Sequence, residues 1–249
     1  MKLQDKVAIV TGGASGFGRG IAETFAREGA RVVVADLNGE GAEEVARGIS
    51  NSAVAFAGDV TERSDVERMI ATAVDTYGGL DIMVNNAGYT HINQPLMSVT
   101  EDDFDRTYAV NVKAIYLATL ACVPEMKKRG GGVIINTAST AGLRPRPGLT
   151  WYNGSKGAAV ILSKSMAVEL APEKIRVNAL CPVIGETGML ERFMGVPDTP
   201  ENRAKFLATI PLGRMSQPQD IANAALYLAS PDAEFITGVA LEIDGGRCV

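Results

Sequence analysis

Hydrophobic residues in this chain form short β-branched runs, and these runs alternate with longer segments in which apolar positions recur every three or four residues. The short runs predict strands at Val7–Val10, Arg31–Ala35, Ala53–Ala57, Ile82–Val84, Gly132–Asn136, Arg176–Leu180 and Val239–Ile243. The longer segments predict helices, including Gly18–Glu28, Ser64–Tyr77, Asp102–Lys128, Trp151–Leu170 and Pro218–Leu228. Alternating elements are typical of βαβ units, and unbroken apolar strands are typical of a parallel sheet. We therefore expect one domain, residues 1–249, of the α/β class: a Rossmann-like, doubly wound, seven-stranded parallel sheet flanked by helices.

One long interval departs from this alternation. Between residues 183 and 217 no strand is predicted, and the pattern is interrupted at Gly185, Gly188, Gly195, Pro197, Pro200, Pro211 and Gly213. Long connections in compact domains usually serve as binding loops or lids. The sequence therefore predicts a substrate loop or lid at about residues 183–217.

Composition excludes several classes of function. The 249 residues carry 24 basic and 29 acidic side chains, for a net charge of −5, which gives no reason to expect nucleic acid as a partner. No run approaches the ~18 apolar residues of a membrane span, and no apolar signal core precedes the first strand. The three cysteines are widely separated and have no CxxC spacing. We expect a cytoplasmic protein with no membrane and no metal.

A glycine-rich segment follows the first predicted strand. It runs from Thr11 to Gly20 as TGGASGFGRG and leads directly into a helix. In such a unit the glycines let the backbone approach a pyrophosphate, and the helix N-terminus directs free N–H groups toward the phosphates. The alternative is a tight turn that is rich in glycine by chance, because glycine motifs match often.

An acidic residue at the end of the second strand shifts the balance toward a dinucleotide site. Asp36 can accept hydrogen bonds from both adenosine ribose hydroxyls and would repel a 2′-phosphate. Ser15 and Leu37 offer no cation that would hold such a phosphate. Taken alone, Asp36 is also compatible with a helix cap or a solvated turn. Together with the glycines, it favours NAD over NADP.

A second group of residues indicates proton transfer. Tyr152 and Lys156 are four residues apart, so on a helix they share one face. A nearby ammonium lowers the pKa of a phenol, which makes the phenol usable as an acid and a base. As an isolated match, this spacing more often marks a surface pair. Here Ser139 precedes Tyr152 by thirteen residues, at the end of the fifth predicted strand.

Further residues lie at the carboxyl ends of strands, where doubly wound sheets bind their ligands. Asn85-Asn86-Ala87-Gly88 closes the fourth strand, and Asn111 lies within the long helix. In their spacing and order, these motifs resemble the short-chain dehydrogenase/reductase family, over essentially the whole chain from Val7 to Gly246. The resemblance implies an NAD(H)-dependent oxidoreductase that interconverts a secondary alcohol and a ketone by hydride transfer, on a small alcohol, sugar or hydroxy acid.

The same resemblance implies individual roles. Tyr152 is the acid/base, and Ser139 holds the substrate oxygen. Lys156 binds the nicotinamide ribose and lowers the pKa of Tyr152, while Asn111 anchors a water that relays protons. The implied cofactor-binding residues are Gly12, Ser15, Gly16, Phe17, Gly18, Asp36, Leu37, Asp59, Val60, Asn86, Ala87, Gly88, Tyr152, Lys156, Pro182, Val183, Ile184 and Thr187. The family often has Gly where this chain has Val183, so the backbone path after Pro182 is expected to differ slightly.

The substrate pocket is less well defined by the sequence. Arg144 and Arg146 lie on a proline-stiffened loop and are candidates to bind a carboxylate, phosphate or sulfonate; the alternative is an exposed or intersubunit salt bridge. His91 is a candidate contact, against the alternative of a solvated loop histidine. Trp151 and Met189 are candidate apolar walls, as are Leu149, Phe193 and Met194.

Two other functions remain open at this stage. Lys127-Lys128-Arg129 resembles a carrier-protein docking patch, which makes a 3-oxoacyl-carrier-protein reductase the second candidate, although those enzymes mostly use NADP and Asp36 argues against it. The cations also complement the dipole of the helix that they end. A non-catalytic dinucleotide sensor is the remote alternative, and it is disfavoured because Tyr152 and Lys156 are both present. The family's last strand commonly packs between subunits, so a homotetramer is expected.

Overall fold

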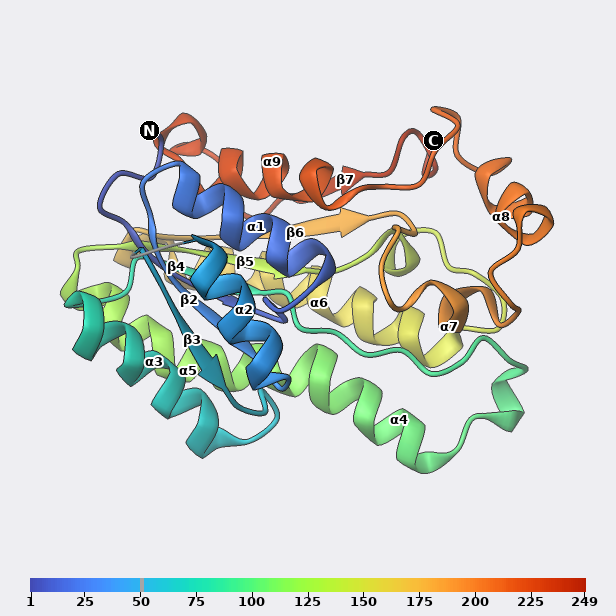
Figure 1. Ribbon diagram of the computed structural model, residues 1–249, viewed down its shortest axis with the longest axis horizontal. Coiled ribbons are helices and arrows are strands. Elements are labelled where there is room, and N and C mark those ends of the chain that lie inside the picture. The colour runs from blue at the N-terminus through green and yellow to red at the C-terminus, as the bar shows by residue number, and fades with distance from the viewer. Residues whose placement is uncertain (50–51) are drawn as a thin grey trace.

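One parallel sheet of seven strands forms the centre of the computed structural model, which describes residues 1–49 and 52–249 (Figure 1). The strand order is β3-β2-β1-β4-β5-β6-β7, and every neighbouring pair is parallel. The strands are β1 (Val7–Thr11), β2 (Arg31–Asp36), β3 (Ala53–Ala57), β4 (Ile82–Asn85), β5 (Gly132–Thr137), β6 (Ile175–Pro182) and β7 (Ala240–Ile243). All seven predicted strands are present, so the predicted fold class is confirmed.

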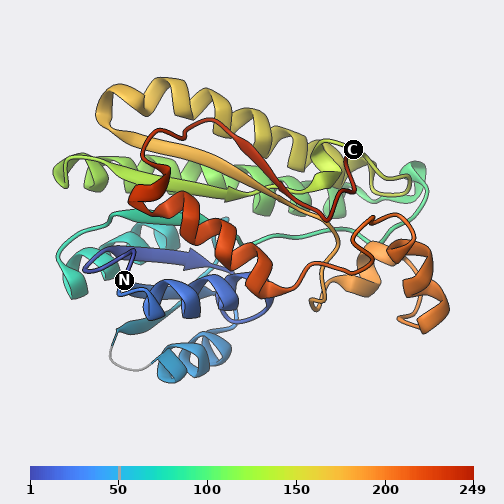
Figure 2. The ribbon, with the colours of Figure 1, turned by 90° about the horizontal axis from the view of Figure 1, so that it is seen from above.

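Helices cover both faces of this sheet (Figure 2). One face is covered by α1 (Gly16–Arg27), α2 (Gly39–Ile49) and α9 (Pro218–Ala229), and the other by α3 (Arg63–Tyr77), α5 (Ala114–Lys128) and α6 (Thr150–Leu170). The helix α2 was not among those predicted, because Gly39 and Gly41 in its first turn weaken the helical pattern.

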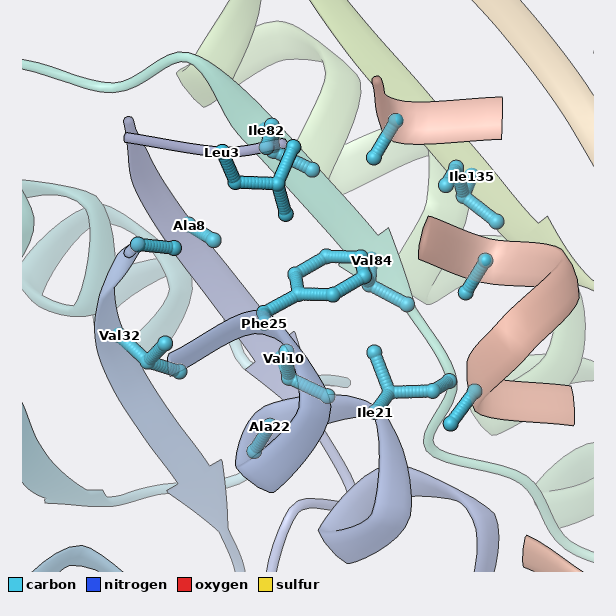
Figure 3. Close-up of a cluster of buried hydrophobic side chains, with 14 of the residues drawn as sticks. Leu3, Ala8, Val10, Ile21, Ala22, Phe25, Val32, Ile82, Val84 and Ile135 are labelled. Carbon is cyan, nitrogen blue, oxygen red and sulfur yellow. The ribbon is translucent and has the colours of Figure 1, made fainter. Parts of the chain in front are cut away.

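Two apolar clusters, one on each face, hold the helices to the sheet. In the first, Phe25 and Ile21 of α1 lie fully buried against Val10 and Val84 of the central strands (Figure 3). Close packing of this kind fixes the strand ends relative to the helix that begins at the glycine-rich loop. The fold thus sets the positions of the loops at the carboxyl edge of the sheet.

The long helix predicted at residues 102–128 contains an irregular turn. It consists of α4 (Glu101–Tyr108), a π-helical turn (Ala109–Lys113) and α5. Single π turns inside helices are frequent at functional sites. Here the turn carries Asn111, which the sequence analysis placed in the catalytic group.

The same helical segment, Glu101–Lys128, is long and apolar enough by length and composition to cross a membrane. One such helix is weak evidence, because the core helix of a soluble protein passes the same test. Leu117 and Cys122 on one face pack against the sheet, while Tyr116 and Leu120 are 54% and 46% exposed. Exposed apolar side chains on a helix are candidates for a contact between subunits.

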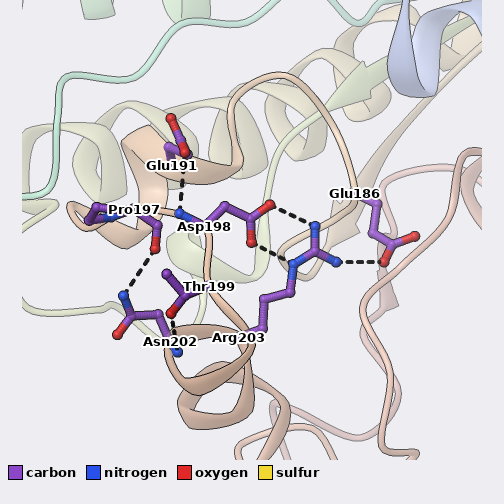
Figure 4. A network of polar contacts seen from close by, with 7 residues as sticks. All are labelled: Glu186, Glu191, Pro197, Asp198, Thr199, Asn202 and Arg203. Atoms are coloured by element: carbon purple, nitrogen blue, oxygen red, sulfur yellow. Dashed lines mark hydrogen bonds and ion pairs between the residues drawn. The ribbon is translucent and has the colours of Figure 1, made fainter.

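The interval between β6 and β7 extends beyond the carboxyl edge of the sheet. It contains the short helices α7 (Leu190–Met194) and α8 (Pro200–Leu207) before α9 begins. Figure 4 shows that Arg203 of α8 pairs with Asp198 (Nη2–Oδ2 2.7 Å) and with Glu186 (Nη1–Oε1 3.2 Å). These exposed ion pairs connect α8 to the chain that leaves β6. No strand lies in the interval among the described residues, as predicted; Gly185 and Ser216 form one isolated bridge.

Candidate active site

A cavity of about 450 Å³ lies at the carboxyl edge of the sheet, where the connections from β1 and β4 leave in opposite directions. In doubly wound folds this reversal is where ligands bind. Every residue of the predicted cofactor-binding set lines the cavity except Gly18. The sheet therefore brings together residues that are up to 175 positions apart in the chain, from Gly12 to Thr187.

The glycine-rich loop is held against the end of β4. The Asn86 side chain donates to the carbonyl oxygens of Thr11 (2.9 Å) and Gly12 (3.4 Å), and the Asn86 and Ala87 backbone amides both donate to Thr11 Oγ1 (3.0 Å). A Cβ atom at Gly18 would lie 2.0 Å from the Gly12 oxygen, so only glycine fits there. Gly18 thus lies beneath the loop and allows its tight path, while Gly12 faces the cavity.

Asp36 faces the cavity and also supports the loop. Its carboxylate accepts hydrogen bonds from the backbone amides of Ala14 (3.0 Å) and Asn38 (2.9 Å). A carboxylate can accept hydrogen bonds from more than two donors. Asp36 can therefore bind these backbone amides and a ribose hydroxyl at the same time. Leu37 beside it is 69% exposed and supplies no charge.

Tyr152 lies in the first turn of α6 and is buried within the cavity wall. Its ring meets Phe193 edge to face at a centroid distance of 5.1 Å. Burial raises the pKa of the Tyr152 phenol above its usual range, and a hydrogen bond from Ser139 opposes that shift. The Ser139 hydroxyl also lies 3.4 Å from the Pro182 carbonyl. The predicted pair of hydroxyl groups is therefore assembled at one point of the cavity.

Lys156 is one turn further along α6 and is almost fully buried. Its ammonium donates to the Thr137 carbonyl (2.7 Å) and lies 5.9 Å from the centre of the Tyr152 ring. Burial lowers the pKa of Lys156 to about 8. Lys156 does not lower the pKa of Tyr152, contrary to the prediction from their spacing: desolvation of the phenol dominates, and Lys156 is not among the groups that shift this pKa.

Asn111 lies behind this pair, in the π-helical turn. Its side chain exchanges two hydrogen bonds with the Tyr89 backbone (2.9 and 3.0 Å) and donates to Ser155 Oγ (2.9 Å). A Cβ atom at Gly88 would lie 3.6 Å from both Asn111 Oδ1 and Lys156 Nζ. Gly88 therefore lies close to both of these polar groups.

Only some of the candidate substrate-binding residues line the cavity. Met189 and Arg146 line the cavity, but Arg144 and Trp151 do not. Arg144 is exposed and donates to the Arg247 carbonyl, while the Trp151 indole packs against Phe104 at 5.5 Å. Of the further apolar candidates, Leu149 and Phe193 line the cavity and Met194 is buried beside it against Leu190 and Met215.

The alternative interpretation of His91 as a solvated loop residue is wrong. His91 is fully buried, its Nδ1 lies 2.8 Å from the Ile92 carbonyl, and its Nε2 has no hydrogen-bond partner among the described residues. It also does not line the cavity. The loop turns inward because it packs beneath α7, where Arg192 donates to the Thr90 carbonyl.

Tyr89, Arg106 and Phe206 are among the cavity residues that were missed from the sequence. Arg106 of α4 stacks over Tyr89 at 4.6 Å, and Phe206 of α8 covers Arg146 at 5.1 Å. Tyr89 directly follows Gly88, so its position was a usable signal. The positions of Arg106 and Phe206 depend on how α4 and α8 pack, which no local pattern in the sequence encodes.

A small polar group lies near the C-terminus, outside the cavity. The ligating atoms of Glu242, Asp244 and Cys248 lie within 4.8 Å of one another, although the sequence showed no metal-binding spacing. The Asp244 carboxylate accepts hydrogen bonds from the amides of Gly246 (2.9 Å) and Cys248 (2.7 Å). Through these hydrogen bonds Asp244 stabilises the C-terminal turn, which explains its position without a metal ion.

Comparison with known proteins agrees with this geometry. The family model described as enoyl-(acyl carrier protein) reductase matches residues 12–247, and the chain belongs to the short-chain dehydrogenase/reductase family. It is 51% identical to the 4-formylbenzenesulfonate dehydrogenase of Comamonas testosteroni, over 99% of each chain. It is 36% identical to a 3-oxoacyl-[acyl-carrier-protein] reductase of Thermotoga maritima, over the full length of both. A solved 3-ketoacyl-(acyl-carrier-protein) reductase of Brucella melitensis, complexed with NADH, superimposes with a TM-score of 0.94 at 47% identity, covering 99% of this chain and 100% of that one.

Proposed function

We propose that this oxidoreductase uses NAD(H) and interconverts a secondary alcohol and a ketone, or a closely related carbinol and carbonyl pair. The observation that carries the proposal is that Tyr152, Lys156 and Ser139 line the same cavity as the glycine-rich loop and Asp36. A fold alone does not imply a reaction, but this cavity joins a dinucleotide site to a proton-transfer group. The relative from Comamonas is named for a substrate with a formyl group, which is a carbonyl.

The cofactor assignment rests on the residues of the adenosine end. The free N–H groups at the start of α1 and the close approach of the glycine loop fit a pyrophosphate, and Asp36 fits a ribose with two free hydroxyls. The Brucella structure holds NADH, in agreement with the predicted cofactor. Bound NAD supplies the acceptor for hydride from the carbinol carbon.

Side chains of this protein accept and donate the proton of the reaction. In alcohol oxidation, the hydroxyl proton of the substrate passes to the Tyr152 phenolate oxygen as hydride leaves the carbinol carbon, and Ser139 holds the substrate oxygen through its hydroxyl. Lys156, held at the Thr137 carbonyl 5.9 Å from the centre of the Tyr152 ring, binds the nicotinamide ribose, and Asn111 behind this pair continues the path for the proton. In carbonyl reduction the same proton moves back from Tyr152 to the oxygen.

The second candidate, a reductase of carrier-protein thioesters, is favoured by the names of two relatives. The cations predicted to form its docking patch do not support it. Lys127 pairs with Glu173, Lys128 with Glu125, and Arg129 with Asp81. Each cation thus has a carboxylate partner within this chain, which leaves a largely neutralised surface at the end of α5. We therefore favour a small-molecule substrate.

We expect the protein to form a homotetramer in solution. Tyr116 and Leu120 of α5, together with Ile161 and Val168 of α6, expose apolar surface on neighbouring helices, with Val168 80% exposed. Burying such a patch between subunits is favourable at ~25 cal/mol per Å² of apolar surface. Light scattering should report a tetramer, and Ile161→Glu with Val168→Glu should shift it to smaller species.

The control for each single change, Ile161→Glu or Val168→Glu, is Met97→Glu, which adds one glutamate at a side chain that is 89% exposed in the chain between β4 and α4. It should leave the assembly intact. A wild-type protein that is monomeric at micromolar concentration would contradict the proposed assembly.

NAD-linked turnover tests whether the protein is an enzyme of this kind. The wild-type protein should convert at least one class of alcohol or carbonyl with a matching change in nicotinamide absorbance. Binding of the dinucleotide without turnover of any class would favour the sensor instead.

A further inference from the structure

One arginine, Arg146, lines the cavity from a loop that is hydrogen-bonded on both sides. Arg146 is in the connection from β5 to α6, and its carbonyl accepts a hydrogen bond from the Asn153 side chain (2.8 Å). Asn153 follows Tyr152 directly, so the loop is tied to the turn of helix that carries the phenol. On its other side, the Gln94 amide donates to the Gly148 carbonyl (3.0 Å). Arg146 is thereby held in a defined position relative to Tyr152.

The Arg146 guanidinium has few partners within the protein. It lies over the Phe206 ring of α8 at 5.1 Å, and Nη2 is 3.5 Å from Thr209 Oγ1, at the limit of a hydrogen bond. A guanidinium carries five N–H donors in a planar fork that matches an oxyacid. The Arg146 guanidinium donates one such hydrogen bond, to Thr209, so most of its N–H groups have no partner among the described residues.

Two further arginines increase the positive charge at this point. Arg144 donates to the Arg247 carbonyl, and the charges of both Arg144 and Arg247 act on Arg146. None of the three forms an ion pair with a carboxylate in residues 1–49 and 52–249. Arg247 Nε is buried and has no hydrogen-bond partner there. Burial, and then the two neighbouring cations, lower the pKa of Arg146 to about 10.

A partly buried cation beside two like charges is unfavourable unless an anion compensates it. We propose that Arg146 binds an acidic group of the substrate, a carboxylate or a sulfonate, with Arg144 and Arg247 raising the local positive potential. The substrate class is then an alcohol or carbonyl compound that carries an oxyacid at its far end. This inference rests on the proposed function, because it assigns the reacting carbon to Tyr152.

The cavity wall between Tyr152 and Arg146 indicates what kind of spacer joins the carbinol and the acidic group of the substrate. Leu149 and Phe193 line the cavity beside Tyr152, and Phe206 lines it beside Arg146. Apolar and aromatic walls with one placed charge are typical of small-molecule sites, in which the charge sets the orientation. An apolar or aromatic spacer between the carbinol and the acid fits this arrangement.

The test begins with binding, which does not require turnover. Benzoate, benzenesulfonate and neutral benzamide are titrated into wild-type enzyme by calorimetry in the presence of NADH. We expect both acids to bind at least ~10-fold more tightly than the amide, because a charge-assisted hydrogen bond contributes about 1.5–3 kcal/mol. A preference for only one acid identifies which oxyacid the site takes. Equal binding of all three would overturn the inference.

The second arm measures turnover of matched alcohols: 4-(1-hydroxyethyl)benzoate, 4-(1-hydroxyethyl)benzenesulfonate and 1-(4-methylphenyl)ethanol. In Arg146→Met, the ratio of kcat/KM for an acid to kcat/KM for the neutral alcohol should fall ~10- to 100-fold, mainly through KM. Arg146→Lys should restore part of the loss, because it keeps the charge without the planar fork. The matched control is Arg47→Met, an exposed position of α2.

The outcomes separate this inference from the proposed function. Turnover of the neutral alcohol without any acid preference would overturn the anion site alone, as would an equal loss on all three substrates in Arg146→Met. Absence of turnover on every substrate would count against the proposed function, while the binding titration still decides the anion site. Added salt should weaken binding of the acids and not of benzamide.

Discussion

Replacing Tyr152 by Phe should reduce kcat by about 10²-fold or more while NADH binding is retained. The change removes only the phenolic hydroxyl, and the ring keeps its edge-to-face contact with Phe193 and its buried position. Proton transfer is therefore lost without loss of packing. The measurement is steady-state turnover together with a fluorescence titration of NADH. Near wild-type kcat in this variant would rule out Tyr152 as the proton-transfer group.

Two further measurements separate a chemical role from a structural one. Tyr227→Phe, at an exposed tyrosine on α9, is the matched control and should keep full activity. In the wild type, kcat/KM for alcohol oxidation should rise with pH from ~7 to ~9, because oxidation needs the phenolate and burial raises the pKa of Tyr152. Reduction needs the protonated phenol, so its rate should not rise over the same range. The residual activity of Tyr152→Phe should lose this pH dependence.

The enzyme should prefer NAD over NADP by at least ~10²-fold in kcat/KM, because the Asp36 carboxylate would meet the 2′-phosphate. Like charges placed together at a desolvated contact cost several kcal/mol, and every ~1.4 kcal/mol is tenfold in affinity. Asp36→Ala with Leu37→Arg should narrow or reverse the preference, because the new guanidinium can pair with the phosphate. Both cofactors must be compared at one ionic strength, since salt screens the repulsion.

The structure adds a complication to this experiment and suggests its control. Asp36 accepts hydrogen bonds from Ala14 and Asn38, so Asp36→Ala also loosens the glycine-rich loop and should weaken both cofactors. Asp36→Asn keeps an acceptor oxygen and removes the charge, so it should relieve the repulsion with less damage to the loop. Wild-type enzyme that turns over NADP as well as NAD would show that Asp36 does not meet the adenosine ribose.

The fold could be predicted because its signals are local. Most strands are short, mainly apolar runs, and residues of the cofactor end lie at or just after the ends of strands: Asp36 is the last residue of β2 and Asn86 follows β4. In a parallel sheet all carboxyl ends meet at one edge, so sequence order alone places these residues together. The positions of Tyr152 and Lys156 follow in the same way from helical spacing.

The substrate end could not be predicted to the same depth, because packing between distant segments decides it. Arg144 and Arg146 have almost the same local sequence, yet only Arg146 faces the cavity, where Phe206 of α8 covers it. His91 is buried because α7 packs over its loop. The pKa of Tyr152 also depends on burial, which pairwise spacing with Lys156 does not reveal.

The most direct test of the account is NAD(H)-linked turnover by the wild-type protein across secondary alcohols, sugars, hydroxy acids and ketones, with and without an acidic group, followed at the nicotinamide absorbance. We expect at least one class to be converted, with one carbonyl formed for each NADH produced, and Tyr152→Phe to abolish most of that conversion. Tight NADH binding without conversion of any class, or equal conversion by Tyr152→Phe, would contradict this expectation.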